Sequence, residues 1–157
     1  MELQEDSFYE TMIENCGIGA GIIPIALDDN GDIQILLAKE RYVQQWKGSY
    51  RWSGFEGSKK ENENIHENAI RELEEEGLGI ITFDKPIKEL LEEKKYVMRI
   101  VINIFQDRPS NRYHSTYVVK VKWNPNWVED FLILRRKLQT LKILGDELYY
   151  FTTKLTN

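Results

Sequence analysis

Two segments with strict alternation constrain the fold of this chain more than any other feature. In residues 96–105 the even positions are apolar, and in residues 113–123 most odd positions are aromatic or aliphatic. A period of two over this length predicts strands, and residues 107–111 between them have the composition of a turn. We therefore expect a sheet at the centre of the fold.

Further strands are expected on both sides of this pair. Apolar residues 17–27 and 33–39 flank the turn Asp28-Asp29-Asn30-Gly31, which predicts a hairpin-like connection. Pro24 within the first run predicts an edge strand or a bulge. Residues 80–83 and 148–155 are also strand-like.

Two long helices are expected beside these strands. The first spans residues 63–77, with Asn62 or Asn64 as N-cap and Gly77 or Gly79 at its end. The second spans about 127–144 and carries apolar residues on one face (Phe131, Leu134, Leu138, Leu141). Strands mixed with long helices predict an α/β fold, to which residues 1–16 add a short amphipathic arm with helical character.

Length and composition limit the classes of protein to consider. The chain has 157 residues, which fits one domain, so we expect a single domain over 1–157. Its one cysteine, Cys16, excludes an intramolecular disulfide and a multi-cysteine zinc site, and favours a reduced, cytoplasmic setting. The net charge of −5 gives no sequence-wide basic field for duplex nucleic acid. No apolar run approaches the roughly 20 residues of a membrane span, and the acidic start differs from a signal peptide.

The helix over 63–77 carries carboxylates on its apolar side. At about 100° per residue, one stripe collects the apolar residues Ile65, Ala69 and Leu73. Glu72 and Glu76 fall inside or beside this stripe and Glu75 flanks them, whereas the opposite side has its own glutamates. A like-charge pair four residues apart costs a few tenths of a kcal/mol, and a divalent cation would offset that cost. Clustered oxygens suit Mg²⁺ or Mn²⁺, although a solvated acidic face is the alternative.

The segment from Gly57 to Gly79 resembles the box of the Nudix hydrolases, G-x5-E-x7-R-E-U-x-E-E-x-G-U, where U is a bulky aliphatic residue. The matching positions are Gly57, Glu63, Arg71, Glu72, Leu73, Glu75 and Glu76. The chain departs from the pattern in two places. Leu78 stands where the closing Gly is expected and Gly79 follows one residue late, which predicts a helix exit lengthened by one. Upstream, Glu56 stands where the family often has Gly.

The resemblance implies a Nudix-like α/β/α sandwich with a mixed sheet, and a pyrophosphohydrolase. Such an enzyme cleaves the phosphoanhydride bond of a nucleoside diphosphate linked to another moiety, in a nucleotide derivative or a dinucleoside polyphosphate. By the same resemblance, the catalytic Mg²⁺ or Mn²⁺ is held by three carboxylates and one backbone carbonyl (Glu72, Glu75, Glu76, and the carbonyl of Glu56). Glu63 pairs with Arg71 to fix the loop, and Gly57 permits a close backbone approach.

Substrate contacts and the general base are less constrained. Aromatic faces at Trp46 and Trp52 could stack on a base or pack beneath the loop, and Arg51 could meet phosphates or lie in solvent. Tyr96 stands at a distance from the box that the family associates with dinucleoside polyphosphate hydrolases, but core packing explains it equally. A box glutamate or a downstream acid supplies the base in the family. Glu129 is the downstream candidate, and the helix dipole also explains a glutamate there.

Two other functions remain open. One is an mRNA cap hydrolase of the same fold, for which the only basic run (Arg135, Arg136, Lys137) gives weak support. The other is a Nudix-fold nucleotide-binding or regulatory module without turnover. The expected partner is a small nucleotide and no membrane is expected, while the oligomeric state stays open, with a homodimer among the alternatives.

Overall fold

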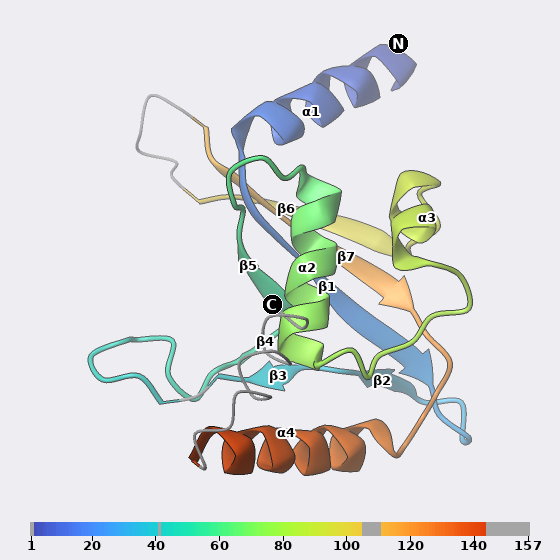
Figure 1. Ribbon diagram of the computed structural model, residues 1–157. Helices are drawn as coiled ribbons and strands as arrows, with labels where there is room; N and C mark the ends of the chain where they lie inside the picture. The colour runs from blue at the N-terminus through green and yellow to red at the C-terminus, as the bar shows by residue number, and fades with distance from the viewer. Residues whose placement is uncertain (1, 41, 105–110, 144–157) are drawn as a thin grey trace.

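The computed structural model describes residues 2–40, 42–104 and 111–143. Its central element is a five-stranded mixed sheet with the order β2-β1-β7-β6, in which β5 also pairs with β1 (Figure 1). These strands are β1 (Gly17–Leu27), β2 (Ile33–Ile35), β5 (Phe55–Ser58), β6 (Met98–Asn103) and β7 (Tyr113–Lys120). The α/β class and the mixed sheet predicted from the sequence are confirmed. The strand predicted over 148–155 lies outside the described residues.

Strand β1 is the central strand, so the edge position predicted from Pro24 is wrong. β1 runs parallel to β7, and it pairs antiparallel with β5 over Gly19–Ile22 and with β2 over Ile25–Leu27. Pro24 lies between these two partners, where the strand changes neighbour and a missing N–H breaks no ladder bond. The irregularity that the sequence placed at Pro24 occurs instead between Gly17 and Gly19.

Residues 40–61, a long connection in sequence, contain structure of their own. β3 (Ala38–Lys39) pairs antiparallel with β4 (Trp52–Ser53) in a separate two-stranded sheet. β5 then carries the start of the box, with Gly57 opposite Ala20 of β1. The box therefore begins on a strand of the main sheet.

The two alternating segments form the pair β6–β7, but both strands are shorter than predicted and β6 exposes its apolar side chains. Met98, Ile100 and Ile102 are all more than 40% exposed. They lie on the same face as Thr116 and Val118, whereas the buried core residues Tyr117 and Val119 lie on the opposite face. Alternation predicted the strand correctly, but it could not show which face the helices cover.

The described residues form four helices beside the sheet: α1 (Glu2–Cys16), α2 (Ile65–Gly77), α3 (Ile87–Glu92) and α4 (Trp127–Ile143). The helical arm and the two long helices were predicted, and the predicted apolar face of α4 is half-buried. Residues 80–83, predicted as a strand, are not one; Ile81 and Phe83 instead pack against the core as the chain leads to α3. The six-residue α3 was missed, and it buries Leu91 at 1% exposure. Within the described residues, no helix combines the length and apolarity needed to cross a membrane.

Helix α2 is held over β1 and β5 by its apolar stripe. Ile65, Ala69 and Leu73 are 1%, 0% and 4% exposed, and they pack in one core cluster with Ile22 and Phe55. Burying a side chain such as Ile65 or Leu73 contributes roughly 1.5–3 kcal/mol. This packing fixes the height and rotation of α2, and therefore the position of its carboxylates.

The exit of α2 uses two left-handed residues. The helix ends at Gly77, Leu78 follows with φ 53° and Gly79 with φ 69°. A left-handed residue other than Gly costs roughly 1–2 kcal/mol. Gly79, which follows one residue later than the box pattern expects, therefore does not remove the backbone strain at Leu78, because Leu78 itself is left-handed.

We expect Asn64→Ala to destabilise the fold by about 1 kcal/mol, because Asn64 is the N-cap of α2. Its side-chain oxygen accepts from the Glu67 N–H at 2.8 Å, and the Glu67 carboxylate accepts from the Asn64 N–H at 2.9 Å, a complete capping box. Urea unfolding measures the change, with the exposed Glu61→Ala as control. Equal midpoints for Asn64→Ala and wild type would show that the cap contributes nothing.

Candidate active site

The glutamates of α2 divide between a protein-facing and a solvent-facing side. Glu72 is buried at 8% exposure and Glu75 and Glu76 are half-buried, whereas Glu67 and Glu74 are exposed. This division is the one that the helical wheel predicts. The three half-buried or buried carboxylates therefore lie where α2 meets the sheet.

Gly57 permits a close approach between α2 and β5. A Cβ atom added to Gly57 would lie 2.5 Å from the carboxyl carbon of Glu72, well inside van der Waals contact. The Glu72 carboxylate thus lies directly against the strand backbone, and a larger residue would displace it.

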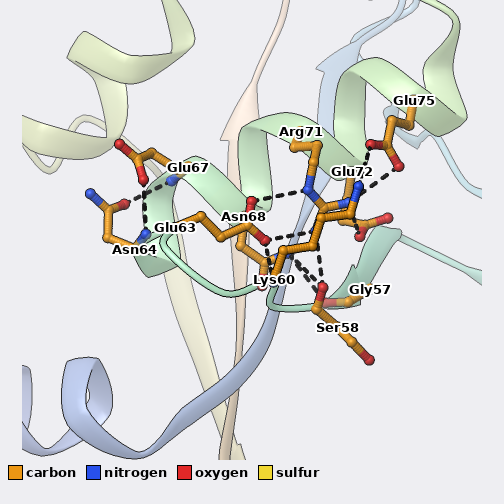
Figure 2. A network of polar contacts seen from close by, with 10 residues as sticks. All are labelled: Gly57, Ser58, Lys60, Glu63, Asn64, Glu67, Asn68, Arg71, Glu72 and Glu75. Atoms are coloured by element: carbon orange, nitrogen blue, oxygen red, sulfur yellow. Dashed lines mark hydrogen bonds and ion pairs between the residues drawn. The ribbon is translucent and has the colours of Figure 1, made fainter. Parts of the chain in front are cut away.

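Arg71 joins the box loop to the helix, as Figure 2 shows. Its Nε and Nη2 donate to the two oxygens of Glu63 at 3.0 and 2.8 Å, and Nη2 also donates to the Ser58 carbonyl at 2.9 Å. The pair implied by the box is therefore present in bidentate form. The hydrogen bonds from Arg71 hold the pKa of Glu63 below its ordinary value.

The same guanidinium also contacts the catalytic candidates. Arg71 Nη1 donates to Glu72 at 2.6 Å and to Glu75 at 3.2 Å, and Lys60 Nζ lies 3.4 Å from Glu75. The hydrogen bonds from Arg71 to Glu63, followed by those to Glu72, raise the pKa of Arg71 above its ordinary value. Arg71 is thus a permanent positive charge at the centre of three carboxylates.

Asn68 is a part of the site that the sequence did not reveal. It is fully buried, and its Nδ2 reaches towards the carbonyls of Gly57 and Ser58 at 3.4 and 3.5 Å. Its Oδ1 is buried without a hydrogen-bond partner in the described part of the chain. The helical wheel contained the signal, because Asn68 falls on the same arc as Glu72.

Glu76 lies apart from Arg71, against the edge of β5 that faces away from β1. Its Oε2 accepts from the Glu56 N–H at 3.1 Å. Burial raises the pKa of Glu76 to about 7, and the negative charges of Glu40, Glu72 and Glu56 add to this rise. Because the N–H and carbonyl of one strand residue point to the same edge, the Glu56 carbonyl also faces this side.

The side chain of Glu56 points to the other face of the sheet, away from α2. Its Oε2 lies 2.9 Å from His114 Nε2 and accepts from Thr116 Oγ1 at 2.9 Å. The hydrogen bond from His114 is the main reason that the pKa of Glu56 is lowered. No sequence pattern pairs Glu56 with His114, because their contact depends on the parallel register of β1 and β7.

A cavity of about 460 Å³ opens beside Glu76. Its walls come from β3, β4, the exit of α2 and α4, and they include Glu40, Trp52, Phe55, Trp127 and Phe131. The structure thus brings one of the predicted substrate residues, Trp52, into a shared cavity with a box carboxylate. Glu40 and the α4 residues were not identified from the sequence, since nothing local marks α4 as a neighbour of β3.

The other predicted substrate residues lie elsewhere. Trp46 and Arg51 are exposed in the loop between β3 and β4 and are not part of the cavity wall. Tyr96 packs on the core, with its ring centroid 5.1 Å from that of Tyr117. Glu129 is exposed in the first turn of α4.

The donor set around α2 fits a hard divalent cation in its chemistry. Oxygen ligands dominate: three carboxylates (Glu63, Glu72, Glu75) pair with two cations (Arg71, Lys60), and the carboxylate of Glu76 accepts from the Glu56 N–H. Burial, followed by the charges of Glu40, Glu72 and Glu56, raises the pKa of Glu76, so its charged form is disfavoured in the absence of a cation. Across the described ranges, however, no three His, Cys, Asp or Glu side chains are already grouped to hold an ion, and Arg71 donates hydrogen bonds to Glu72 and Glu75.

Comparisons with known proteins give structural similarities only. Neither the scan against family models nor the search of curated proteins gives a match. The chain is similar to a solved Nudix hydrolase from M. smegmatis, RenU, at 11% identity and a TM-score of 0.48, over 80% of this chain and 88% of that one. It is also similar to a C. elegans Ap4A hydrolase at 18% identity and a TM-score of 0.41, over 69% of each chain. It is also similar to a binary complex of a C. elegans Ap4A hydrolase, at 16% identity and a TM-score of 0.40, over 68% of this chain and 66% of that one.

We expect Glu63→Gln to weaken the loop without abolishing activity. Glutamine keeps the shape of Glu63 but loses the charge that binds Arg71, so stability should fall by roughly 1.5 kcal/mol, typical of a hydrogen bond to a charged group. Denaturant unfolding measures this loss, and turnover should fall only in part. If Glu63→Gln leaves stability unchanged and removes activity as completely as Glu76→Gln, the structural role of Glu63 is wrong.

The metal-free protein should lose stability as pH rises from about 4.5 to about 7. Glu76 has a folded-state pKa near 7 against an ordinary value of 4.5, so in this window the folded state binds more protons than the unfolded state. Each rise in pH then favours unfolding, until Glu76 is ionised in both states. Unfolding curves in EDTA at pH 5 and pH 8 measure this effect.

The matched variants for this pH test are Glu76→Gln and the exposed Glu74→Gln. Glu76→Gln should remove the pH-dependent loss that Glu76 causes, and Glu74→Gln should retain it. A constant stability difference between wild type and Glu76→Gln at both pH values would contradict the raised pKa.

Proposed function

We propose that this chain is a metal-dependent Nudix-type pyrophosphohydrolase. Its substrate is a nucleoside diphosphate linked to another moiety, and the bond cleaved is a phosphoanhydride. The observation that carries this proposal is the position of Glu72 and Glu76 on the protein-facing side of α2, against the backbone at Gly57 and Glu56. Carboxylates that serve only solubility would lie on the exposed side, where Glu67 and Glu74 already are.

Glu72, Glu75 and Glu76 would hold Mg²⁺ or Mn²⁺, together with the backbone carbonyl of Glu56. When bound, the ion supplies charge neutralisation at the phosphates and a more acidic water. The like charges around Glu76 make this side of α2 unfavourable without a cation. Hydrolysis at this site is therefore proposed to depend on the metal.

The remaining box residues position the site. Arg71 fixes the carboxylates of Glu63, Glu72 and Glu75 relative to one another, and Asn68 supports the strand carbonyls at Gly57 and Ser58. Catalysis of phosphoryl transfer depends largely on such positioning and on charge stabilisation. We infer that the loop and α2 act as one rigid unit.

The general base is proposed to be one of the box glutamates rather than Glu129. Glu129 is exposed on α4 and is not part of the wall of the cavity beside Glu76. A glutamate in the first turn of a helix is stabilised there by the helix dipole. This explains Glu129 without a catalytic role.

The test is a phosphate-release screen with Mg²⁺ or Mn²⁺ on nucleoside diphosphate derivatives, dinucleoside polyphosphates and capped RNA. We expect turnover on at least one free nucleotide substrate and none in excess EDTA. Glu76→Gln should reduce turnover by at least about a hundredfold, the usual effect of removing a group that stabilises the transition state. The matched control is Glu74→Gln, on the solvent side of the same helix, and it should remain active. Full turnover in EDTA, or equal losses in both variants, would contradict the proposal.

Metal binding is measured separately by melting. Wild type should gain about 2.7 kcal/mol at a metal concentration of one hundred times Kd, and Glu76→Gln should lose most of that gain. A non-catalytic module predicts binding without turnover, and preferred turnover of capped RNA would favour the cap hydrolase. Equal metal responses in wild type and Glu76→Gln would show that α2 does not bind the ion.

A further inference from the structure

We propose that the cavity between α4 and the β3–β4 sheet holds the base of the nucleotide, and that Glu40 selects a base with two adjacent N–H donors, as in guanine. This inference rests on the proposed function, because it assigns the second half of the same substrate. Glu76 and Gly77 form part of the cavity wall. A molecule whose diphosphate lies at Glu76 can therefore extend into the cavity.

The cavity has the size and the walls of a ligand site. Its volume of about 460 Å³ falls within the roughly 300–1,000 Å³ of small-molecule pockets. Its apolar side chains come from distant parts of the chain, with Leu36 and Ala38 on one side and Ile80 and Ile81 on another. Such a lining favours an apolar body with few polar atoms.

Aromatic rings on three elements favour a flat ligand. Trp52 comes from β4, Phe55 from β5, and Trp127 and Phe131 from α4. Trp52 is 64% exposed, so part of its ring is available to a ligand. Stacking of a base on an aromatic side chain contributes about 1–3 kcal/mol. An aliphatic chain would fill the same space without using these ring faces.

Charged groups around the cavity match the two ends of a nucleotide. Lys39 and Arg135 are exposed cations that line it, and Lys39 Nζ already lies 5.7 Å from the centroid of the Trp52 ring. Cations at the rim suit phosphate oxygens. The carboxylate of Glu40, by contrast, is an acceptor that suits the N–H donors of a base.

The carboxylate of Glu40 is held in place and can accept further hydrogen bonds. Its Oε1 accepts from Ser53 Oγ at 3.1 Å, which fixes the side chain from the neighbouring strand. A carboxylate has sites for about four hydrogen bonds. Guanine presents N1–H and N2–H₂ side by side, whereas adenine places one donor next to an acceptor that a carboxylate repels. Inosine, with N1–H alone, is intermediate.

The test measures binding of free nucleosides to the metal-free full chain by tryptophan fluorescence. Guanosine should bind about tenfold more tightly than adenosine, the scale of one hydrogen bond to a charged group, with inosine between them. Trp52→Phe and Trp127→Phe should each reduce the quenching. The matched control Trp123→Phe removes a tryptophan outside this cavity wall and should leave the quenching in place.

Glu40→Gln provides the sharpest comparison, because Gln keeps the shape of Glu40 but presents one donor and one acceptor. That pair suits adenine and also the O6 and N1–H of guanine, so the preference for guanosine should be lost, while the unfolding curve shows that the variant is folded. Equal binding of the nucleosides to wild type, an unchanged preference for guanosine in Glu40→Gln, or quenching that survives both Trp52→Phe and Trp127→Phe would overturn the inference. Quenching by an isoprenyl diphosphate in place of any nucleoside would also overturn it.

These measurements need neither metal nor turnover. Phosphate release without nucleoside binding would overturn the assignment of the cavity and leave the hydrolase proposal standing. Guanosine binding whose preference is lost in Glu40→Gln, in a protein that never releases phosphate, would support the cavity while contradicting the hydrolase.

Discussion

The ion pairs of Arg71 hold the candidate site together. One guanidinium binds both oxygens of Glu63, the carbonyl of Ser58, and the carboxylates of Glu72 and Glu75. Its side chain is only 17% exposed, so these bonds are partly shielded from water and stronger than surface pairs. Without this charge, three carboxylates would repel one another where α2 meets β5. The fold of the box therefore depends on Arg71 before any metal is considered.

Packing sets the geometry within which these charges act. The stripe of Ile65, Ala69 and Leu73 places α2 on the sheet, and Gly57 lets the Glu72 carboxylate approach the strand backbone. Apolar burial is favourable at any rotation that hides the stripe, but only one rotation also places Arg71 over Glu63. The hydrophobic and electrostatic requirements thus select the same arrangement, as expected for a sequence that specifies one structure.

The segment from Gly57 to Gly79 differs at its two ends from the box pattern that it resembles, and the structure shows the conformation at each end. At the start, Glu56 contributes its backbone to the side of Glu76 while its carboxylate turns to His114 and Thr116 on the other face. At the end, Leu78 takes a left-handed turn that glycine would take without strain. Neither departure moves the three glutamates from the protein-facing side of α2.

The sequence by itself determined the α/β class, the long helices and the side of α2 on which the carboxylates lie, because each follows from a local period of 2 or 3.6 residues. It also indicated the Glu63–Arg71 pair, through the fixed spacing of the box. Only the tertiary structure decided that Pro24 lies in a central strand, that β6 exposes its apolar residues, and that Glu56 meets His114. The strand order decides all three features, because it sets which strands are neighbours and which face the helices cover. The cavity that joins Glu40, Glu76 and Phe131 likewise depends on α4 and β3 lining one space, a long-range arrangement that no local pattern encodes.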